Sequence, residues 1–78
     1  MEARFRFVSG EGQVVRISVD VARGSFKCTC ERCTDDFTIL FPPDVESLDL
    51  ALGICCESMV GHAEHHIGPV KQALKVAV

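Results

Sequence analysis

Three cysteines lie close together in the stretch FKCTCERCT, which spans residues 26–34. Cys30 and Cys33 have the spacing C-x-x-C, and Cys28 extends the pattern to C-x-C-x-x-C. A tight turn between two cysteines in this spacing aims both sulfurs at one point, and thiolates are common ligands of zinc. Cys30 and Cys33 are therefore candidate metal ligands, with Cys28 as the substitute.

A second pair of ligands is expected farther along the chain, because structural zinc takes four ligands. His62 and His66 have the spacing H-x3-H, and residues four apart on a helix lie on the same face. The adjacent Cys55 and Cys56 form the other available pair, but neighbours on a helix point about 100° apart and chelate one ion poorly. We therefore predict a zinc site built from the C-x-x-C and H-x3-H pairs.

The order C-x-x-C followed by H-x3-H resembles the ligand order of C2H2 zinc fingers. The gap from Cys33 to His62 is about twice the one in that family, which indicates a knuckle between strands that faces a helix end. The stretch FKCTCERCTDDF is also similar to the first half of a zinc ribbon or treble-clef finger, although Thr34 stands where those knuckles usually have Gly. A second C-x-x-C is absent from the sequence.

Other interpretations of these side chains remain open. A redox-active C-x-x-C normally opens a helix, where the helix dipole lowers the thiol pKa. Here the motif follows a strand-like run, and Asp35 and Asp36 oppose thiolate formation, so metal binding is favoured over redox chemistry. Free cysteines also pack in cores, and Cys55 is interpreted in that way because it lies on the apolar line of a predicted helix. His62 and His66 can equally cap the core with their rings.

Cysteine count and charge restrict the class of protein. Five cysteines cannot all pair within one chain, and the first ten residues lack the apolar stretch of a secretion signal. We therefore expect a cytoplasmic protein with reduced thiols. The net charge of −3 argues against nucleic acid as a partner. No membrane span is expected, because no run of about 18 apolar residues occurs.

The periodicity of apolar residues predicts three strands. Residues 3–8 and 13–22 alternate between apolar and polar side chains and are joined by the sequence SGEG, which is typical of a hairpin. Residues 36–41 are rich in strand-forming side chains and are followed by two prolines, which end the strand. The cysteine stretch is interpreted as a loop between the second and third strands.

An amphipathic helix is predicted from about residue 45 to about 61 or 66, with Asp44 as its N-cap. Its apolar line is formed by Leu48, Leu52, Cys55, Met59, His62 and His66. Gly61 favours the shorter helix, whereas the sequence Ile-Gly-Pro at 67–69 ends the longer one. The tail after Pro69 is predicted as a short helix, and an edge strand over 75–78 is the alternative.

The predicted fold is thus one α+β domain over residues 1–78, without a linker. A three-stranded antiparallel sheet is packed by one helix and a short C-terminal helix or strand. The core side chains expected from the sheet are Phe5, Phe7, Val15, Ile17, Val19, Ile39 and Phe41. Those expected from the helix are Leu48, Leu52, Cys55 and Met59.

The predicted function is that of a small interaction module, stapled by zinc, that binds another protein. No catalysis is expected, because a closed four-ligand site leaves no open position on the metal. One alternative is a thiol-based metal carrier or redox and sulfur relay that uses the C-x-C-x-x-C cluster. The other is a metal-free structural or interaction protein, for which a homodimer is one way to complete the core.

Overall fold

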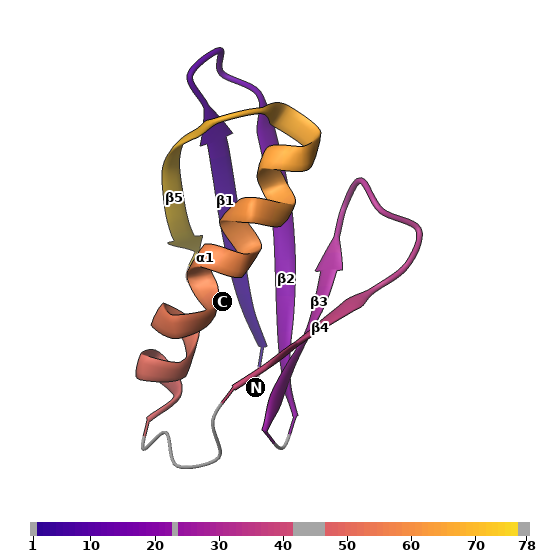
Figure 1. Ribbon diagram of the computed structural model, residues 1–78, viewed down its shortest axis with the longest axis vertical. Coiled ribbons are helices and arrows are strands. Elements are labelled where there is room, and N and C mark those ends of the chain that lie inside the picture. Colours follow the sequence, from indigo (N-terminus) through magenta and orange to yellow (C-terminus); the bar gives the residue numbers. More distant parts are fainter. Residues whose placement is uncertain (1, 23, 42–46, 77–78) are drawn as a thin grey trace.

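The computed structural model describes residues 2–22, 24–41 and 47–76, apart from the side chains of residues 22, 48, 49, 52, 54 and 55. In this part of the chain, one helix lies across one face of a five-stranded antiparallel sheet (Figure 1). The elements are β1 (Glu2–Ser9), β2 (Val14–Ala22), β3 (Ser25–Cys30), β4 (Phe37–Leu40), α1 (Leu48–Ile67) and β5 (Val70–Val76). The strand order is β4-β3-β2-β1-β5, so the α+β class is as predicted.

The hairpin of β1 and β2 forms as the alternation predicts. Phe5 lies opposite Ile17, and both side chains are buried on the side that faces α1. In the turn, the Ser9 hydroxyl accepts hydrogen bonds from backbone N–H groups, including that of Gln13 at 3.1 Å. Gly12 has a φ of 86°, which favours glycine at this position. Local side-chain chemistry thus fixes the register of the hairpin.

The stretch that was predicted to be a cysteine loop contains a strand, and that prediction was wrong. Phe26, Cys28 and Cys30 are buried, whereas Lys27 and Thr29 between them are exposed. This is the period-two alternation of a half-buried strand. β3 pairs with β2, and it therefore carries the first cysteines into the sheet rather than into a loop.

The segment after Pro69 is also a strand, and not the short helix that was preferred. β5 pairs antiparallel with β1, so that Arg4 lies opposite Val76. The strand alternative is right in kind, but β5 already begins at Val70, and residues 77–78 lie outside the described residues. Pairing with β5 satisfies backbone groups along the outer edge of β1, which local apolar spacing does not reveal.

Both ends of α1 are capped. The Ser47 side chain accepts a hydrogen bond from the Leu50 N–H at 3.1 Å, and Gly68 donates its N–H to the Glu64 carbonyl at 3.0 Å. Gly68 has a φ of 73°, as is common for glycine just after a helix. The helix ends at Ile67, close to the longer of the two predicted ends, but it begins at Leu48 rather than near residue 45. Its N-cap is Ser47 and not the predicted Asp44, which lies outside the described residues.

The core lies between α1 and the sheet face beneath it. Several predicted core side chains are buried: Phe5, Phe7, Val15, Ile17, Val19 and Met59. Ile39 and Phe41 are partly buried against this core, and the side chains of Leu48, Leu52 and Cys55 lie outside the described residues. Further buried residues are Ala3, Phe26, Cys28, Cys30, Ala51, Ala63 and Ile67. In the part of the chain that the structure describes, no helix has the length and apolar content needed to cross a membrane.

Candidate metal centre

Four side chains from distant parts of the chain converge beside the end of β3. Their ligand atoms all lie within 4.8 Å of one another, and they belong to Cys30, Cys33, His62 and His66. The Cys33 Sγ lies 3.2 Å from Nε2 of His62 and 3.2 Å from Nε2 of His66. Figure 1 shows that the chain leaving β3 rises beside the later turns of α1. These four residues are positioned to hold a metal ion.

The separations can be compared with those of a tetrahedral zinc site. With Zn–S bonds of about 2.3 Å and Zn–N bonds of about 2.0–2.1 Å, neighbouring ligand atoms in a tetrahedron lie about 3.3–3.8 Å apart. The two measured sulfur–nitrogen distances of 3.2 Å are close to that range. Two sulfurs and two imidazole nitrogens are also a ligand set that zinc commonly takes in structural sites. The residues present therefore fit a zinc ion with small side-chain rotations.

The sulfur pair is produced by a tight turn at the end of β3. Cys30 shares the buried face of this strand with Phe26 and Cys28, so its thiol points toward α1. The Cys33 N–H donates a hydrogen bond to the Cys30 carbonyl at 3.1 Å, which closes the turn. This turn brings the second thiol back toward the first, as the C-x-x-C spacing predicts.

The two residues inside the turn anchor it to β2. The Glu31 carboxylate accepts hydrogen bonds from the Arg16 backbone N–H at 3.1 Å and from the Arg16 guanidinium at 3.3 Å. The Arg32 guanidinium donates to the Val14 carbonyl at 3.0 Å. Glu31 and Arg32 therefore position the cysteines without taking part in the cluster themselves. Sequence analysis missed this role, for which the only signal was two charged residues between the cysteines.

The histidine pair lies on α1 beside the helix stripe that packs into the core. Met59, Ala63 and Ile67 are buried, and each histidine precedes one of the last two residues. One residue corresponds to about 100° of helix rotation, which turns the imidazoles away from the core stripe. The ring centroids of His62 and His66 lie 5.2 Å apart at an interplanar angle of 66°. Both rings present Nε2 to the Cys33 sulfur.

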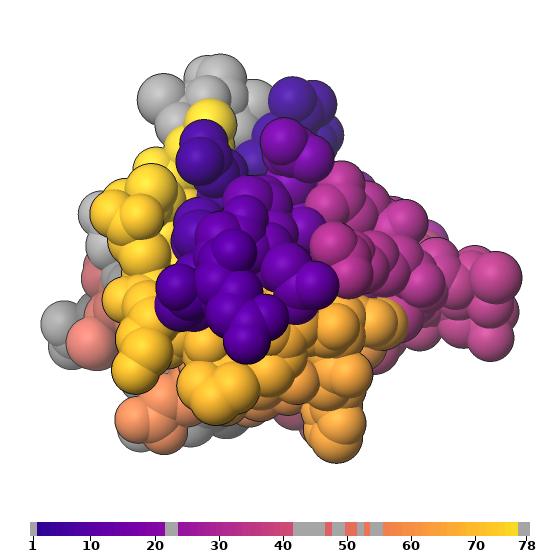
Figure 2. Space-filling model, turned by 90° about the horizontal axis from the view of Figure 1, so that it is seen from above, coloured from indigo at the N-terminus to yellow at the C-terminus, as the bar shows by residue number. Residues whose placement is uncertain are grey.

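An aromatic ring covers one side of the centre. Phe37, the first residue of β4, stacks on the His62 imidazole with ring centroids 4.3 Å apart and an interplanar angle of 23°. Sequence analysis placed Phe37 in a strand and gave it no part in the site. The stacking fixes the plane of His62 and shields the ring from solvent. In Figure 2, the segment between β3 and β4 projects from the body next to the C-terminal part of α1.

The surroundings change the acidity of two of the four groups. Burial raises the pKa of the Cys33 thiol, and its hydrogen bond to Cys30 and the negative charges of Cys30 and Asp35 act in the same direction. Burial lowers the pKa of His62, with smaller contributions from the charges of His66 and His65. His62 therefore stays neutral, as a metal ligand must be, to a lower pH than an exposed histidine. A bound cation would oppose the rise in the Cys33 pKa, because it favours the thiolate.

No protein family, curated protein or solved structure matches this chain. Function is therefore inferred from the geometry of the four side chains and from the elements that hold them.

The other cysteines whose side chains the structure describes, Cys28 and Cys56, do not belong to this group. Cys28, which was predicted as a substitute ligand, is completely buried, and its Sγ lies 3.9 Å from the Phe26 carbonyl oxygen. Cys56 is partly buried on α1, and the side chain of Cys55 lies outside the described residues. The pair of Cys30 and Cys33 is thus the part of the cysteine cluster that meets the histidines.

Proposed function

We propose that this chain is a small interaction module, stapled by one structural zinc ion, that binds another protein. The observation that carries the proposal is the convergence of two thiols and two imidazoles within 4.8 Å. Cys30 and Cys33 supply the sulfurs, and His62 and His66 supply nitrogens through Nε2. Closed sites with four protein ligands support structure rather than catalysis, because the metal keeps no open position.

The position of the cluster supports a stapling role. Domains of this size bury little surface, and many of them need a metal or a partner for stability. α1 packs against β1, β2 and β5, while the four side chains join α1 to the turn that connects β3 with β4. A zinc ion there would hold the hairpin of β3 and β4, at one edge of the sheet, against α1. Metal binding would then contribute directly to the free energy of folding.

Binding of another protein is supported by apolar side chains at the surface. Leu40 is 78% exposed, Leu50 is 56% exposed, and Leu74 and Val76 are also exposed. Single exposed apolar residues are common, but Leu74 and Val76 are two positions apart in β5 and therefore lie side by side on one face of the strand. They mark the outer part of the sheet as a surface that a partner could cover.

The zinc proposal is tested by metal analysis and thermal unfolding under reducing conditions. We expect about one zinc per chain and a large fall in the melting temperature after treatment with a chelator. The matched control is the double variant His62→Ala, His66→Ala, which should neither retain zinc nor respond to the chelator. Absence of zinc from the purified protein, with no effect of added zinc on its melting, would contradict the proposal.

A metal carrier is the second candidate, and the partial exposure of the site favours it. Cys33, His62 and His66 are only partly buried, so an incoming ligand could reach the metal. A carrier passes its ion to another thiol ligand by exchange while it stays folded, whereas a structural ion leaves mainly when the domain unfolds, because its binding is coupled to folding. The rate of zinc transfer to a competing chromophoric chelator separates these functions. Transfer within seconds without unfolding would favour the carrier.

A further inference from the structure

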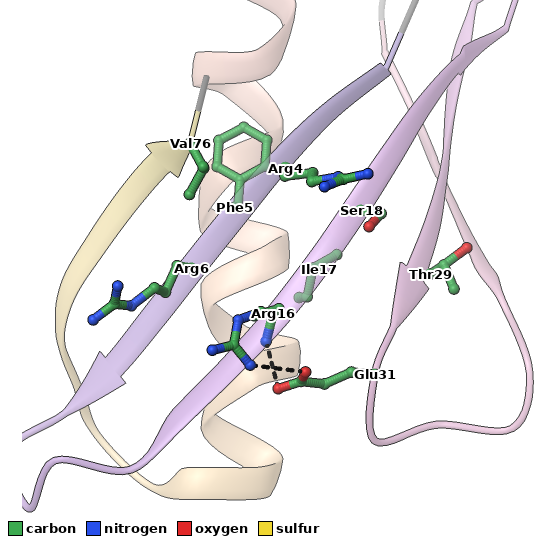
Figure 3. A pocket seen from close by; sticks show the side chains of 9 residues that line it. All are labelled: Arg4, Phe5, Arg6, Arg16, Ile17, Ser18, Thr29, Glu31 and Val76. Carbon is green, nitrogen blue, oxygen red and sulfur yellow. Dashed lines mark hydrogen bonds and ion pairs between the residues drawn. The ribbon is translucent and has the colours of Figure 1, made fainter. Parts of the chain in front are cut away.

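The sheet face opposite α1 carries a hollow of about 480 Å³. Its lining includes two short side chains, Ser18 and Thr29, and three arginines, Arg4, Arg6 and Arg16. The Arg6 side chain extends from β1 toward β5, away from Ser18 and Thr29 (Figure 3). Arg4 extends toward Ser18, and Val76 closes the side formed by β5 (Figure 3). The hollow therefore combines apolar lining with two hydroxyl groups and three guanidinium groups.

Basic side chains outnumber acidic ones in the lining of this hollow, although the chain as a whole is acidic. Three of the eight lysines and arginines line this hollow in a protein with a net charge of −3. Glu31 is the one acidic residue in the lining, and it is engaged by Arg16 at 3.3 Å. Arg4 contacts Glu2 at 3.5 Å, while no ion pair within the described residues involves Arg6.

Two of these arginines occupy paired positions on neighbouring strands. In the pairing of β1 with β2, Arg6 lies directly opposite Arg16. Like charges in this position repel and weaken the sheet. An anionic group placed between them would remove the repulsion, and guanidinium groups bind carboxylates through paired hydrogen bonds. The hollow therefore has a charge that a ligand can complement.

We propose that this hollow is the docking site for an acidic, extended segment of a partner protein. The proposal deepens the protein-binding function proposed above, on which it rests, by naming the surface and the chemistry of the partner. Arg4 and Arg6 are two residues apart on β1, so their side chains leave the same face about 7 Å apart. Carboxylates at alternate positions of an extended peptide have the same spacing. Val76 and Leu74 offer apolar contacts beside them.

Other occupants fit this face less well. Proteins that bind single-stranded nucleic acid use aromatic side chains to stack bases, and the described phenylalanines are buried or partly buried in the core. A second copy laid on the same face by two-fold symmetry would bring arginines close to arginines. A carboxylate-bearing peptide avoids both problems, and it can donate its backbone N–H groups to Ser18 and Thr29 hydroxyl oxygens.

The test measures binding of a fluorescent peptide of about eight residues that alternates Glu with Val, against the same peptide with Gln in place of Glu. We expect the zinc-loaded protein to bind the Glu peptide and to lose affinity by about tenfold in Arg4→Gln and in Arg6→Gln. Lys71→Gln is the matched control, since it removes one positive charge from the opposite face of β5. It should bind as the unmodified protein does. Added salt should weaken binding, because the site is exposed.

Several results would overturn the docking site. They are absence of binding to the Glu peptide, equal binding of the Gln peptide, unchanged affinity in both arginine variants, or tighter binding of oligothymidylate or inorganic phosphate. Zinc content is measured on the same samples. Loss of zinc together with intact, arginine-dependent peptide binding would count against the metal centre and not against this surface, whereas normal zinc with no peptide binding would count against this surface alone.

Discussion

The Cys33 Sγ lies 3.2 Å from Nε2 of His66, although 33 positions separate the two residues in the sequence. One belongs to the turn after β3 and the other to the last turns of α1. A metal shared by these atoms would close a long loop of the chain, and closing a loop removes conformational entropy from the unfolded state.

Replacing His66 by Ala should reduce zinc affinity strongly and lower the melting temperature of the zinc-loaded protein, because one of four ligands is lost. His65→Ala is the matched control: it is the neighbouring residue, it is exposed, and it lies outside the group of four. Competition titration with a chromophoric chelator measures both variants. Equal zinc affinity in the two variants would remove His66 from the ligand set.

The two buried cysteines of β3 should behave differently. Cys30→Ser should lose zinc, whereas Cys28→Ala should keep one zinc per chain and lose about 1–2 kcal/mol of unfolding free energy through poorer packing. Both thiols are buried, but the group of four contains only Cys30. Metal analysis and urea unfolding report on the two properties separately. Loss of zinc from Cys28→Ala in a folded protein would show that the ligand set has been assigned wrongly.

Glu31 should affect the zinc affinity of the metal site although it is not one of the four candidate ligands. Glu31→Gln weakens the hydrogen bonds that hold the knuckle to Arg16, and we expect about tenfold weaker zinc binding, which is typical when support for a ligand is lost. Glu11→Gln removes the same charge from the exposed turn between β1 and β2 and should leave zinc affinity unchanged. If both variants weaken zinc binding equally, the effect is one of net charge rather than of position.

The stability of the metal-free protein should depend on pH through His62. Burial lowers the pKa of this ring below its ordinary value of 6.5, so the folded state binds fewer protons than the unfolded state as the pH falls below that value. The contribution of neutral His62 to the free energy of unfolding is complete above pH 6.5. It is lost as the pH falls from there through the lower pKa of the folded state. Urea unfolding between about pH 7.5 and pH 5 should show this loss, and His62→Gln should make the dependence shallower. An equally steep dependence in that variant would contradict the assignment.

Gly53→Ala should stabilise the protein by about 0.5–1 kcal/mol, because alanine favours the helix and the added methyl group meets open space. Gly12→Ala provides the opposite case, since Gly12 has a φ of 86° and alanine would be strained there. Thermal unfolding of the metal-free protein measures both changes. A loss of stability in Gly53→Ala would mean that α1 does not continue through this residue in solution.

The part of the fold that depends on local patterns was predictable from the sequence. Alternation in β1 and β2 and the end of α1 at Gly68 follow from side-chain periodicity and capping. Of the predicted apolar line of α1, among the side chains that the structure describes, Met59 is buried, whereas His62 and His66 lie beside the buried stripe. β3 was missed because two of its three buried positions, Cys28 and Cys30, are cysteines. They were interpreted as metal ligands, although a free cysteine also behaves as a small apolar residue that can occupy the buried face of a strand. β5 was predicted only as the alternative to a helix and only over 75–78, because its pairing with β1 is a long-range contact that carries no local signal.

In the candidate site, too, the features set by local spacing were predictable, whereas those set by packing between distant elements were not. Spacing alone identified Cys30 and Cys33 as one pair and His62 and His66 as another, since each pair is set by one turn of chain. The stacking of Phe37 on His62 depends on where β4 passes α1, and no spacing rule predicts it.

The pairing of β1 with β5 also has a consequence for assembly. Until residues 70–76 reach it, the outer edge of β1 remains a row of backbone donors and acceptors that any strand could use. The segment between α1 and β5 is short and contains Gly68 and Pro69. Two crowded copies could therefore exchange their β5 strands and form the same hydrogen bonds in an intertwined, domain-swapped dimer.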